Sequence, residues 1–461
     1  MHCLAIKNTE MTETGKQFDT VVIGMGNTGL SCARFLSDRK IHFAMVDSRK
    51  KPPMQHVIET AFPEVPLYTG SFNSNLLCHA ETLLLSPGVS INEPAITNAI
   101  NAGVSVYGDI ELFCRHIKSP VIAITGSNGK STVTTIVAEM ARAAGISVGV
   151  GGNLGPPALD LLKNPEPELY ILELSSFQLE TVSSLNAVAA VVLNISEDHM
   201  DRYFSLDEYT SAKLRIYNGS GVMVLNLDDP KVSNMRREGR RIIGYTLTDP
   251  GSNTYGIRTY AGTQWVVHGD EKIIPTGKVQ IAGSHNISNI LAALALSDVL
   301  QLPQAVIKQV LVNFHGLPHR CQTVSEFDGI TWINDSKGTN VGATRAAITG
   351  LAGDKNIVLI AGGDGKGADF SLLSEVAKKH LHAAVVIGRD GPRIKNVLQA
   401  YIPVIDAMDM NSAVAAAANL ARKGDIVLLS PACASYDMFS DYRARGDSFI
   451  QSVNKMVTHH G

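Results

Sequence analysis

The sequence predicts an α/β protein built from three domains, and two observations support this. First, one phrase recurs along the chain: an apolar run, a loop rich in glycine or serine, and then a helical pattern. It appears as DTVVIGMGNTGLSCARFL, PVIAITGSNGKSTVTTIVAEMA, KNIVLIAGGDGKGADFSLL and DIVLLSPACASYDMF, and apolar strands that alternate with helices are typical of parallel sheets covered on both faces. Second, the length of 461 residues accommodates about two to four domains.

The first part of the chain contains a leading segment and one domain. Residues 1–16 are polar and are expected to form a loose N-terminal extension, with Met11 as an alternative start. Residues 17–108 open with a strand–loop–helix unit and are predicted to form a Rossmann-like domain. The unit contains G-x-G-x-x-G, in VVIGMGNTG, and Asp47 follows about 20 positions on, a spacing that taken alone indicates NAD binding.

Two further blocks make up the rest of the chain. Residues 109–316 are predicted to form a central P-loop-type ATPase domain with a parallel sheet, a more polar strand-like section near 240–282 and a helix from about Asn286. Residues 317–461 hold two more strand–loop units and are predicted to form a C-terminal Rossmann-like α/β domain. In open α/β sheets, ligands bind beyond the carboxyl ends of the strands, and the motifs considered below lie at such positions.

The composition excludes several classes of partner. The formal charge is -3 with no long basic block, so neither nucleic acid nor an acidic membrane face is an expected partner. No apolar run approaches the roughly 18 residues of a membrane span, and the start is too polar for a signal peptide. The six cysteines stand singly, which predicts no zinc knuckle and no disulfide framework and suits a reducing cytoplasm; they are Cys3, Cys32, Cys78, Cys114, Cys321 and Cys433.

The stretch ITGSNGKST, residues 124–132, resembles a phosphate-binding loop but lacks one of its glycines. The usual form is G-x-x-x-x-G-K-[ST], and Ile124 stands where the first glycine belongs. Gly126 and Gly129 nevertheless allow a tight loop whose backbone N–H groups meet an anion at a helix N-terminus. Lys130 and Ser131 add a positive charge and a hydroxyl ligand for Mg²⁺. The alternative is an ordinary capped turn between a strand and a helix.

Acidic groups follow two other apolar strands. Glu173 ends one in YILELSSFQLE, where it is well placed to hold Mg²⁺ beside a phosphate loop or, alternatively, starts a solvated loop. Another strand, in VVLNISEDHMDRY, ends in carboxylates and an imidazole that suit a divalent ion; these are Glu197, Asp198, His199 and Asp201. The alternative is that this cluster caps the following helix through Ser196 or Asp198.

The remaining candidate residues are weaker when taken one at a time. Asn286 and Asn289 lie three apart on one helix face and can read a purine edge, although Asn286 alone fits an N-cap. Spacing alone leaves Lys213 a solvated cation. Two lysines in separate strand-end loops of the third block suggest an anionic ligand; the loops carry Asp335, Ser336, Lys337 and Thr339, then Lys366, then Ser430, Cys433 and Ser435.

Taken together, the motifs and their order resemble the Mur ligases, the ATP-dependent amino-acid-adding enzymes of peptidoglycan synthesis. They are TGSNGKST, GGNLG, LELSSFQLE, EDHMDRY, AKLRIY, HN with a second N three positions on, GLPHR, NDSKGTN, GGDGKGADF and SPACASYD. The resemblance covers nearly the whole chain after residue 16, and the short G-x-x-G-K-[ST] loop is the family's own form. It is greatest to the members that add D-glutamate to UDP-N-acetylmuramoyl-L-alanine, through an acyl phosphate, in cytoplasmic precursor synthesis.

The resemblance implies a role for each group of residues. The first domain would hold the UDP end of a sugar nucleotide rather than NAD, lined by Asn27, Thr28, Asp47, Ser48, Arg49 and Gly88, with Asn153 and His199 facing the muramoyl-alanine end. ATP would be bound by Gly126, Asn128, Gly129, Lys130, Ser131, Thr132, Asn286, Asn289, Arg320 and Asp335. D-glutamate or the transferring phosphate would be surrounded by Lys337, Thr339, Lys366, Ser435 and Tyr442, the last often phenylalanine in related enzymes.

The resemblance also implies the metal chemistry. Two Mg²⁺ ions are expected, the first served by Ser131 and Glu173 and the second by His199 and Lys213. In the family the matching lysine carries a carbamate made from CO₂, which turns a cation into an oxygen ligand that suits Mg²⁺. The expected catalytic residues are therefore Lys130, Glu173, His199, Lys213 and Lys366, in a protein expected to be a monomer.

Three other functions stay open from the sequence. One is a ligase of the same superfamily that adds a different amino acid or extends folate. The second is an NAD-dependent dehydrogenase, based on G-x-G-x-x-G alone, although a dehydrogenase has no use for a second triphosphate site. The third is a nucleotide sensor that binds ATP without releasing phosphate.

Overall fold

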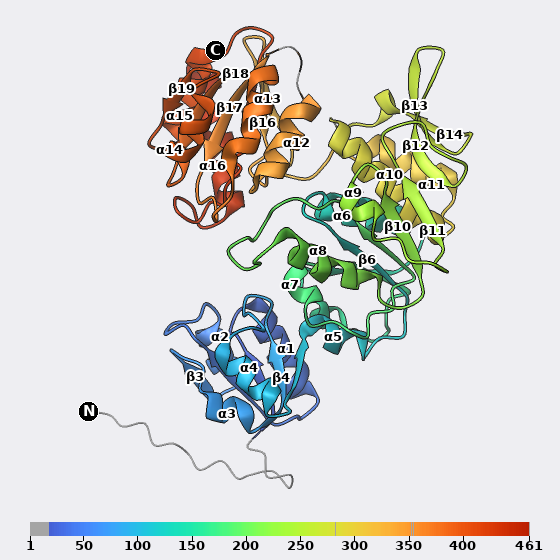
Figure 1. Cartoon of the computed structure of the whole chain (residues 1–461), viewed down its shortest axis with the longest axis vertical. Helices are drawn as coiled ribbons and strands as arrows, with labels where there is room; N and C mark the ends of the chain where they lie inside the picture. Colours follow the sequence, from blue (N-terminus) through green and yellow to red (C-terminus); the bar gives the residue numbers. More distant parts are fainter. Residues whose placement is uncertain (1–17, 282, 352, 354, 461) are drawn as a thin grey trace.

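The computed structural model describes residues 18–281, 283–351, 353 and 355–460, so the prediction made for residues 1–16 lies outside it. These described residues form three sheets in sequence order, each covered by helices, and the predicted α/β class is confirmed. In Figure 1 the first sheet (blue) and the third (orange to red) lie on either side of the middle region, with α7 and α8 between them. No helix in these ranges is long and apolar enough to cross a bilayer.

The first sheet has five parallel strands in the order β3-β2-β1-β4-β5, the doubly wound arrangement expected of a Rossmann-like unit. Gly29 lets the first helix approach the end of β1, because a Cβ atom there would lie 1.9 Å from the carbonyl oxygen of Gly24. The strands are β1 (Phe18–Ile23), β2 (Phe43–Asp47), β3 (Leu67–Thr69), β4 (Ala80–Leu85) and β5 (Ser105–Gly108). The helices are α1 (Asn27–Asp38), α2 (Gln55–Ala61), α3 (Ser74–Cys78) and α4 (Pro94–Asn101).

The middle sheet has nine strands in the order β14-β13-β12-β11-β10-β9-β6-β8-β7. Its central strands are buried along their whole length because helices cover both faces. The strands are β6 (Val121–Thr125), β7 (Val148–Gly152), β8 (Leu169–Glu173), β9 (Ala189–Val192), β10 (Val222–Asn226), β11 (Ile242–Tyr245), β12 (Thr254–Tyr260), β13 (Thr263–His268) and β14 (Glu271–Pro275). The last four confirm the strand-like section predicted near 240–282, and β12 to β14 form an antiparallel extension.

The helices of the middle region pack on the faces of its sheet. The α-helices are α5 (Asp109–Cys114), α6 (Lys130–Ala143), α7 (Ser176–Leu179), α8 (Leu206–Leu214), α9 (Pro230–Ser233), α10 (Ser284–Val299) and α11 (Gln304–Asn313). Short 3₁₀ helices are η1 (Ala158–Leu161), η2 (Arg215–Tyr217) and η3 (Thr276–Lys278). The apolar faces of α6 and α10 pack over β6, β9 and β10 in one core.

The third sheet has six strands in the order β15-β16-β20-β17-β18-β19, parallel except for β15. The strands are β15 (Gln322–Phe327), β16 (Ile330–Asn334), β17 (Ile357–Gly362), β18 (Leu381–Ile387), β19 (Val404–Asp406) and β20 (Ile426–Leu429). The helices are α12 (Val341–Leu351), η4 (Phe370–Leu372), α13 (Leu373–His380), α14 (Gly391–Leu398), α15 (Met410–Leu420) and α16 (Tyr442–His460). Strands β16, β17 and β20 are neighbours, so the three predicted ligand loops meet at one edge. The domain boundaries at 108 and 316 remain predictions.

Candidate active site

The loop between β6 and α6 has the geometry of a phosphate-binding loop. Gly129 precedes α6 with φ of 85°, and a Cβ atom there would lie 2.3 Å from Oδ1 of Asn289, so glycine is required twice over. Within the described residues no side chain caps the helix start, so the alternative of an ordinary capped turn is wrong. Asn194 anchors the loop from β9, because its backbone oxygen accepts from the N–H of Ser127 at 2.9 Å and its Oδ1 accepts from that of Asn128 at 2.8 Å.

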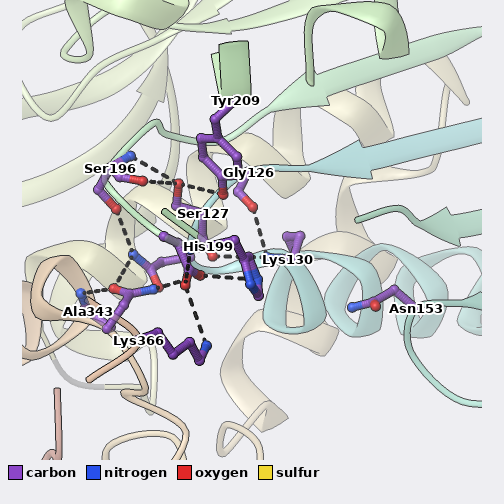
Figure 2. A network of polar contacts seen from close by, with 12 residues as sticks. Gly126, Ser127, Lys130, Asn153, Ser196, His199, Tyr209, Ala343 and Lys366 are labelled. Atoms are coloured by element: carbon purple, nitrogen blue, oxygen red, sulfur yellow. Dashed lines mark hydrogen bonds and ion pairs between the residues drawn. The ribbon is translucent and has the colours of Figure 1, made fainter. Parts of the chain in front are cut away.

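Lys130 lies over this loop, and no carboxylate among the described residues forms an ion pair with it. Its Nζ donates to the carbonyl oxygens of Gly126 at 2.8 Å and Ser127 at 2.9 Å, as Figure 2 shows. Burial lowers the pKa of the Lys130 amine. The loop therefore holds a desolvated cation where an anion would relieve it.

Glu173 is the last residue of β8, and its carboxylate is buried beside α6. Ser131 Oγ donates to its Oε2 at 2.6 Å, and Asn153 Nδ2 donates to its Oε1 at 2.6 Å. Glu173 is 2% exposed, so the alternative that it starts a solvated loop is wrong. The residues predicted to bind the metal, the ATP phosphates and the muramoyl-alanine end thus meet at one carboxylate.

Lys213 is buried rather than solvated, contrary to what its spacing alone suggested. It lies near the end of α8, and its Nζ donates to Thr125 Oγ1 at 3.2 Å and to the Gly126 carbonyl oxygen at 3.0 Å. Burial, and then the charge of Lys130, hold the pKa of Lys213 well below its usual range. The amine is therefore favoured in its neutral form, which is the nucleophilic one.

Asp198 and His199 lie in the loop that follows β9, and both line the same cavity. His199 has φ of 58° and its ring packs edge-on against Phe177 at 4.7 Å between centroids. Asp198 Oδ2 lies 3.7 Å from His199 Nε2. The alternative that this cluster caps the next helix is wrong, because α8 begins at Leu206 and its cap is Ser205.

Three side chains of the third domain reach this middle-domain edge. Asn340 Nδ2 donates to Asn128 Oδ1 and to Asp198 Oδ2, each at 3.2 Å. Lys366 Nζ lies 3.7 Å from Asp198 Oδ1, and Arg320 Nη2 donates to Ser131 Oγ at 2.7 Å. Figure 2 shows Lys366 and His199 near the loop that carries Lys130.

One cavity collects the predicted metal, phosphate and amino-acid residues. Its lining includes Asn128, Gly129, Lys130, Ser131, Asn153, Glu173, His199, Lys213, Arg320, Lys337, Thr339, Lys366, Ser435 and Tyr442. Lys337 Nζ lies 4.1 Å from the centre of the Tyr442 ring. Burial, followed by the charges of Arg320 and Lys130, lowers the pKa of Lys337 to about 8. Several cations thus crowd one cavity, which favours an anionic ligand.

A second cavity adjoins the first and is lined by seven of the ten residues predicted to bind ATP; Lys130 and Ser131 line the first cavity instead, and Gly126 is in the lining of neither. The lining of the second cavity includes Asn128, Gly129, Thr132, Asn286, Asn289, Arg320 and Asp335. Asn286 is the third residue of α10, which follows Gly283, so it is not the N-cap. Its Oδ1 accepts from Asn289 Nδ2 at 3.2 Å. Asp335 is held by Ser430 Oγ at 2.7 Å, and burial raises its pKa to about 6.

A third cavity lies between the first and middle domains. With a volume of about 810 Å³, it suits a ligand of nucleotide-sugar size, and its lining includes Asn27, Thr28, Asp47, Ser48, Arg49, Gly88 and Asn153. Both carboxylate oxygens of Asp47 are already used, by the Met25 N–H at 2.8 Å and by Arg49 at 2.6 and 2.8 Å. A dehydrogenase would need this carboxylate for a ribose hydroxyl, so the NAD alternative is not favoured.

Comparison with known proteins agrees with this geometry. The Mur ligase MurD-like N-terminal domain matches residues 18–108, the Mur ligase middle domain matches residues 124–297, and the Mur ligase glutamate ligase domain matches residues 319–433. The chain belongs to the Mur ligase family.

Individual Mur ligases are similar over nearly the full length. The chain is 51% identical to a UDP-N-acetylmuramoylalanine--D-glutamate ligase of Nitrosococcus oceani, over 95% of this chain and 97% of that one. It is 48% identical to the protein of that name from Methylococcus capsulatus, over 95% of each chain. The MurF ligase of Thermotoga maritima, solved in complex with ADP, shares the fold with a TM-score of 0.61 at 15% identity, over 96% of each chain.

Several Mur ligase site contacts lie outside the residues that the motifs singled out. Asn194 and Tyr209 hold the phosphate loop, since Tyr209 OH lies 3.1 Å from Ser127 Oγ. Asn340 was within NDSKGTN but had no role assigned. Its contact with Asn128 spans 212 positions of sequence, and no local pattern in either segment encodes such a pairing.

Proposed function

We propose that this chain is the ligase that joins D-glutamate to UDP-N-acetylmuramoyl-L-alanine at the expense of ATP. The proposal depends above all on the cavity that contains Lys130, Glu173, Lys213 and Lys337. It shares Asn128, Gly129, Arg320 and Lys337 with the nucleotide cavity and Asn153 with the cavity of the first domain. Relatives at 46–51% identity carry the name of this activity.

The chemistry explains why three ligands must meet. A carboxylate is a poor electrophile, so one of its oxygens attacks the γ-phosphorus of ATP and ADP leaves, which yields an acyl phosphate. The amine of D-glutamate then attacks the acyl carbon, loses a proton and expels phosphate. The first step joins two anions, and unit charges 4 Å apart repel by about 4 kcal/mol at an effective dielectric of about 20. Lys130, Arg320, Lys337 and Lys366 line the cavity where that repulsion arises.

The donors present fit Mg²⁺ that arrives largely with ATP. Among the described residues, no group of three or more His, Cys, Asp or Glu side chains forms a preformed metal cage. Mg²⁺ in phosphoryl-transfer sites uses one or two carboxylates together with phosphates and waters, and Glu173 with Ser131 supplies such a pair of oxygens. Bound Mg²⁺ would neutralise charge on the transferring phosphate. Ser131 and Glu173 would hold one ion, His199 and Lys213 the other.

The proposed carbamate of Lys213 is consistent with its environment. A primary amine must be neutral to add to CO₂, and burial favours that form here. Its two hydrogen-bond partners, Thr125 Oγ1 and the Gly126 carbonyl oxygen, are uncharged. Protein exposed to ¹³C-bicarbonate should show a carbamate resonance that is absent from Lys213→Ala and present in the control Lys231→Ala, whose side chain is exposed.

Phosphate release tests the function directly. The purified protein with ATP, Mg²⁺ and UDP-N-acetylmuramoyl-L-alanine should release phosphate with D-glutamate and far less with L-glutamate, L-lysine or diaminopimelate. Release with another of these amino acids would assign the chain to a different branch of the family. No release with any of them would contradict the ligase assignment.

A further inference from the structure

An ion pair across the first domain boundary faces the sugar-nucleotide cavity. On α1, Ser31 and Arg34 lie four and seven positions after Asn27, so the three share one helix face. Opposite this face is Asp160, in η1 of the middle domain. Ser31 Oγ donates to Asp160 Oδ1 at 2.7 Å, while Arg34 donates through Nε to Oδ1 at 3.3 Å and through Nη2 to Oδ2 at 2.5 Å.

Arg34 and Asp160 line the same cavity as Asn27 and Thr28. The Arg34 side chain is 45% exposed and that of Asp160 is 24% exposed. Within the part of the chain that the structure describes, no hydrogen bond involves Nη1 of Arg34. The guanidinium is therefore fixed along one edge and has donors to spare along the other.

The two arginines of this cavity are held in the same way. Arg49 is gripped by Asp47 through Nε and Nη2, within the first domain. Arg34 donates from the same two nitrogens to Asp160, which belongs to the next domain. A half-exposed pair contributes little to stability, whereas a guanidinium whose orientation is set in advance loses less entropy when it binds an anion.

The anion-binding N-terminus of α1 and Arg34 lie along one face of the same helix and line one cavity. Seven residues of helix rise roughly 10 Å, and helical side chains point back toward the N-terminus. The N-terminus of α1, at Asn27 and Thr28, favours an anion through its backbone N–H groups. Arg34, Thr28 and Asn153 all line this one cavity, so a ligand that meets the helix N-terminus can also reach the guanidinium.

We propose that Arg34, held by Asp160 across the domain boundary, is a binding residue for the diphosphate of the sugar nucleotide. The proposal rests on the function given above and extends it to two residues outside the motifs. The affinity for the sugar nucleotide would therefore depend on the relative position of the first and middle domains.

Calorimetry with UDP and with UDP-N-acetylmuramoyl-L-alanine tests the proposal on the full chain. Arg34→Ala should raise both dissociation constants roughly tenfold to a hundredfold, the range for a lost charged hydrogen bond. Arg34→Lys keeps the charge without the fork and should recover part of the loss. Asp160→Asn keeps the arginine but removes the carboxylate that orients it, and it should weaken binding less than Arg34→Ala does.

Two controls separate binding from folding. Arg258→Ala removes an arginine that likewise bridges aspartates, Asp249 at 2.6 Å and Asp270 at 2.7 Å, outside the cavity lining. It should leave both dissociation constants unchanged. Binding of a non-hydrolysable ATP analogue should be unchanged in every variant.

The outcomes distinguish this inference from the proposed function. Unchanged UDP affinity in Arg34→Ala would overturn the inference while wild-type ligase activity stood. Equal losses in Arg34→Ala and Asp160→Asn, accompanied by equal falls in melting temperature, would assign the pair to domain docking and would also overturn it. If the wild-type protein released no phosphate with any amino acid, the function would fail on its own evidence.

Discussion

The two domain junctions of this Mur ligase are built from different kinds of contact. At the first, Arg202 of the middle domain donates to the carbonyl oxygens of Pro87 at 2.9 Å and Val89 at 3.2 Å. Glu180 holds that arginine at 2.6 Å. At the second junction, Asn340, Lys366 and Arg320 contact the phosphate loop and its neighbours through side chains that line the cavities.

This difference predicts which domain changes its position when ligands bind. At the first junction the Arg202 contacts go to backbone carbonyls and to Glu180, which are not proposed to bind substrate, so we expect them to persist when ligands bind. The Arg34–Asp160 pair is the one contact of this junction that we propose to meet a ligand. At the second junction, two of the three groups that join the domains, Arg320 and Lys366, are proposed to bind substrates. We therefore expect ligands to compete with these contacts, and we expect the position of the third domain to respond to binding.

The largest expected effect is at the second junction. Lys366→Ala should lower kcat roughly 10²- to 10³-fold, as the loss of one electrostatic stabiliser does. The midpoint of thermal unfolding should hardly change, because a single ion pair at 3.7 Å contributes about 0–1 kcal/mol. Phosphate-release kinetics and calorimetry measure the two quantities. A large fall in midpoint with kcat intact would reverse the comparison.

The second largest effect is expected at the first junction, on the stability of the fold. Arg202→Met breaks a pair whose side chains are 13% and 15% exposed and leaves Glu180 without its cation. We expect the free energy of unfolding in urea to fall by about 2–4 kcal/mol. The KM for the sugar nucleotide should rise while that for D-glutamate stays constant. Unaltered stability would show that the first junction does not depend on this arginine.

Replacing Lys337 should have a smaller effect on stability, and it should stabilise the fold instead of destabilising it. Its pKa in the folded protein is about 8, below an unfolded value of about 10.4, so the folded state disfavours the charge. This free-energy cost to folding is complete below pH 8. Between about pH 8 and 10.4 the unfolded state binds more protons than the folded state, so the cost falls as pH rises and disappears above that range.

Lys337→Met should therefore stabilise the fold at pH 7 by about 1–3 kcal/mol, and the gain should vanish near pH 10. Urea unfolding across this range measures it. D-glutamate-dependent phosphate release should be lost in the same variant. A variant less stable than the wild type at pH 7 would show that the lysine charge is compensated in the folded protein.

The smallest effect is expected far from both junctions. Arg258→Ala removes a surface arginine whose partners Asp249 and Asp270 are 68% and 100% exposed. The free energy of unfolding should change by less than about 0.5 kcal/mol, with kcat unchanged. A larger loss would mean that exposed ion pairs contribute more in this protein than the comparison of the junctions assumes.

Much of the site could be predicted because each motif is local. A glycine loop after an apolar strand predicts an anion site wherever the strand lies, and Glu173 follows its own strand in the same way. Lys213 could not be placed by spacing, since its burial depends on α8 covering the end of β6. Asn286 fits a cap by composition, but α10 begins two residues earlier. Arg34 and Asp160 pair across 126 positions, beyond the range of any periodicity.

By itself, the sequence determined the strands, the helices and the loops at the strand ends, because hydrophobic period and glycine act within a few residues. The tertiary structure decided which loops face one another and which charges lose their water. It placed Lys130, Lys213 and Glu173 around one cavity, and it brought Asn340 within hydrogen-bond distance of Asn128. Desolvation and the choice of hydrogen-bond partners depend on segments that lie from 42 to 212 positions apart in the sequence, and they set the chemistry of the site.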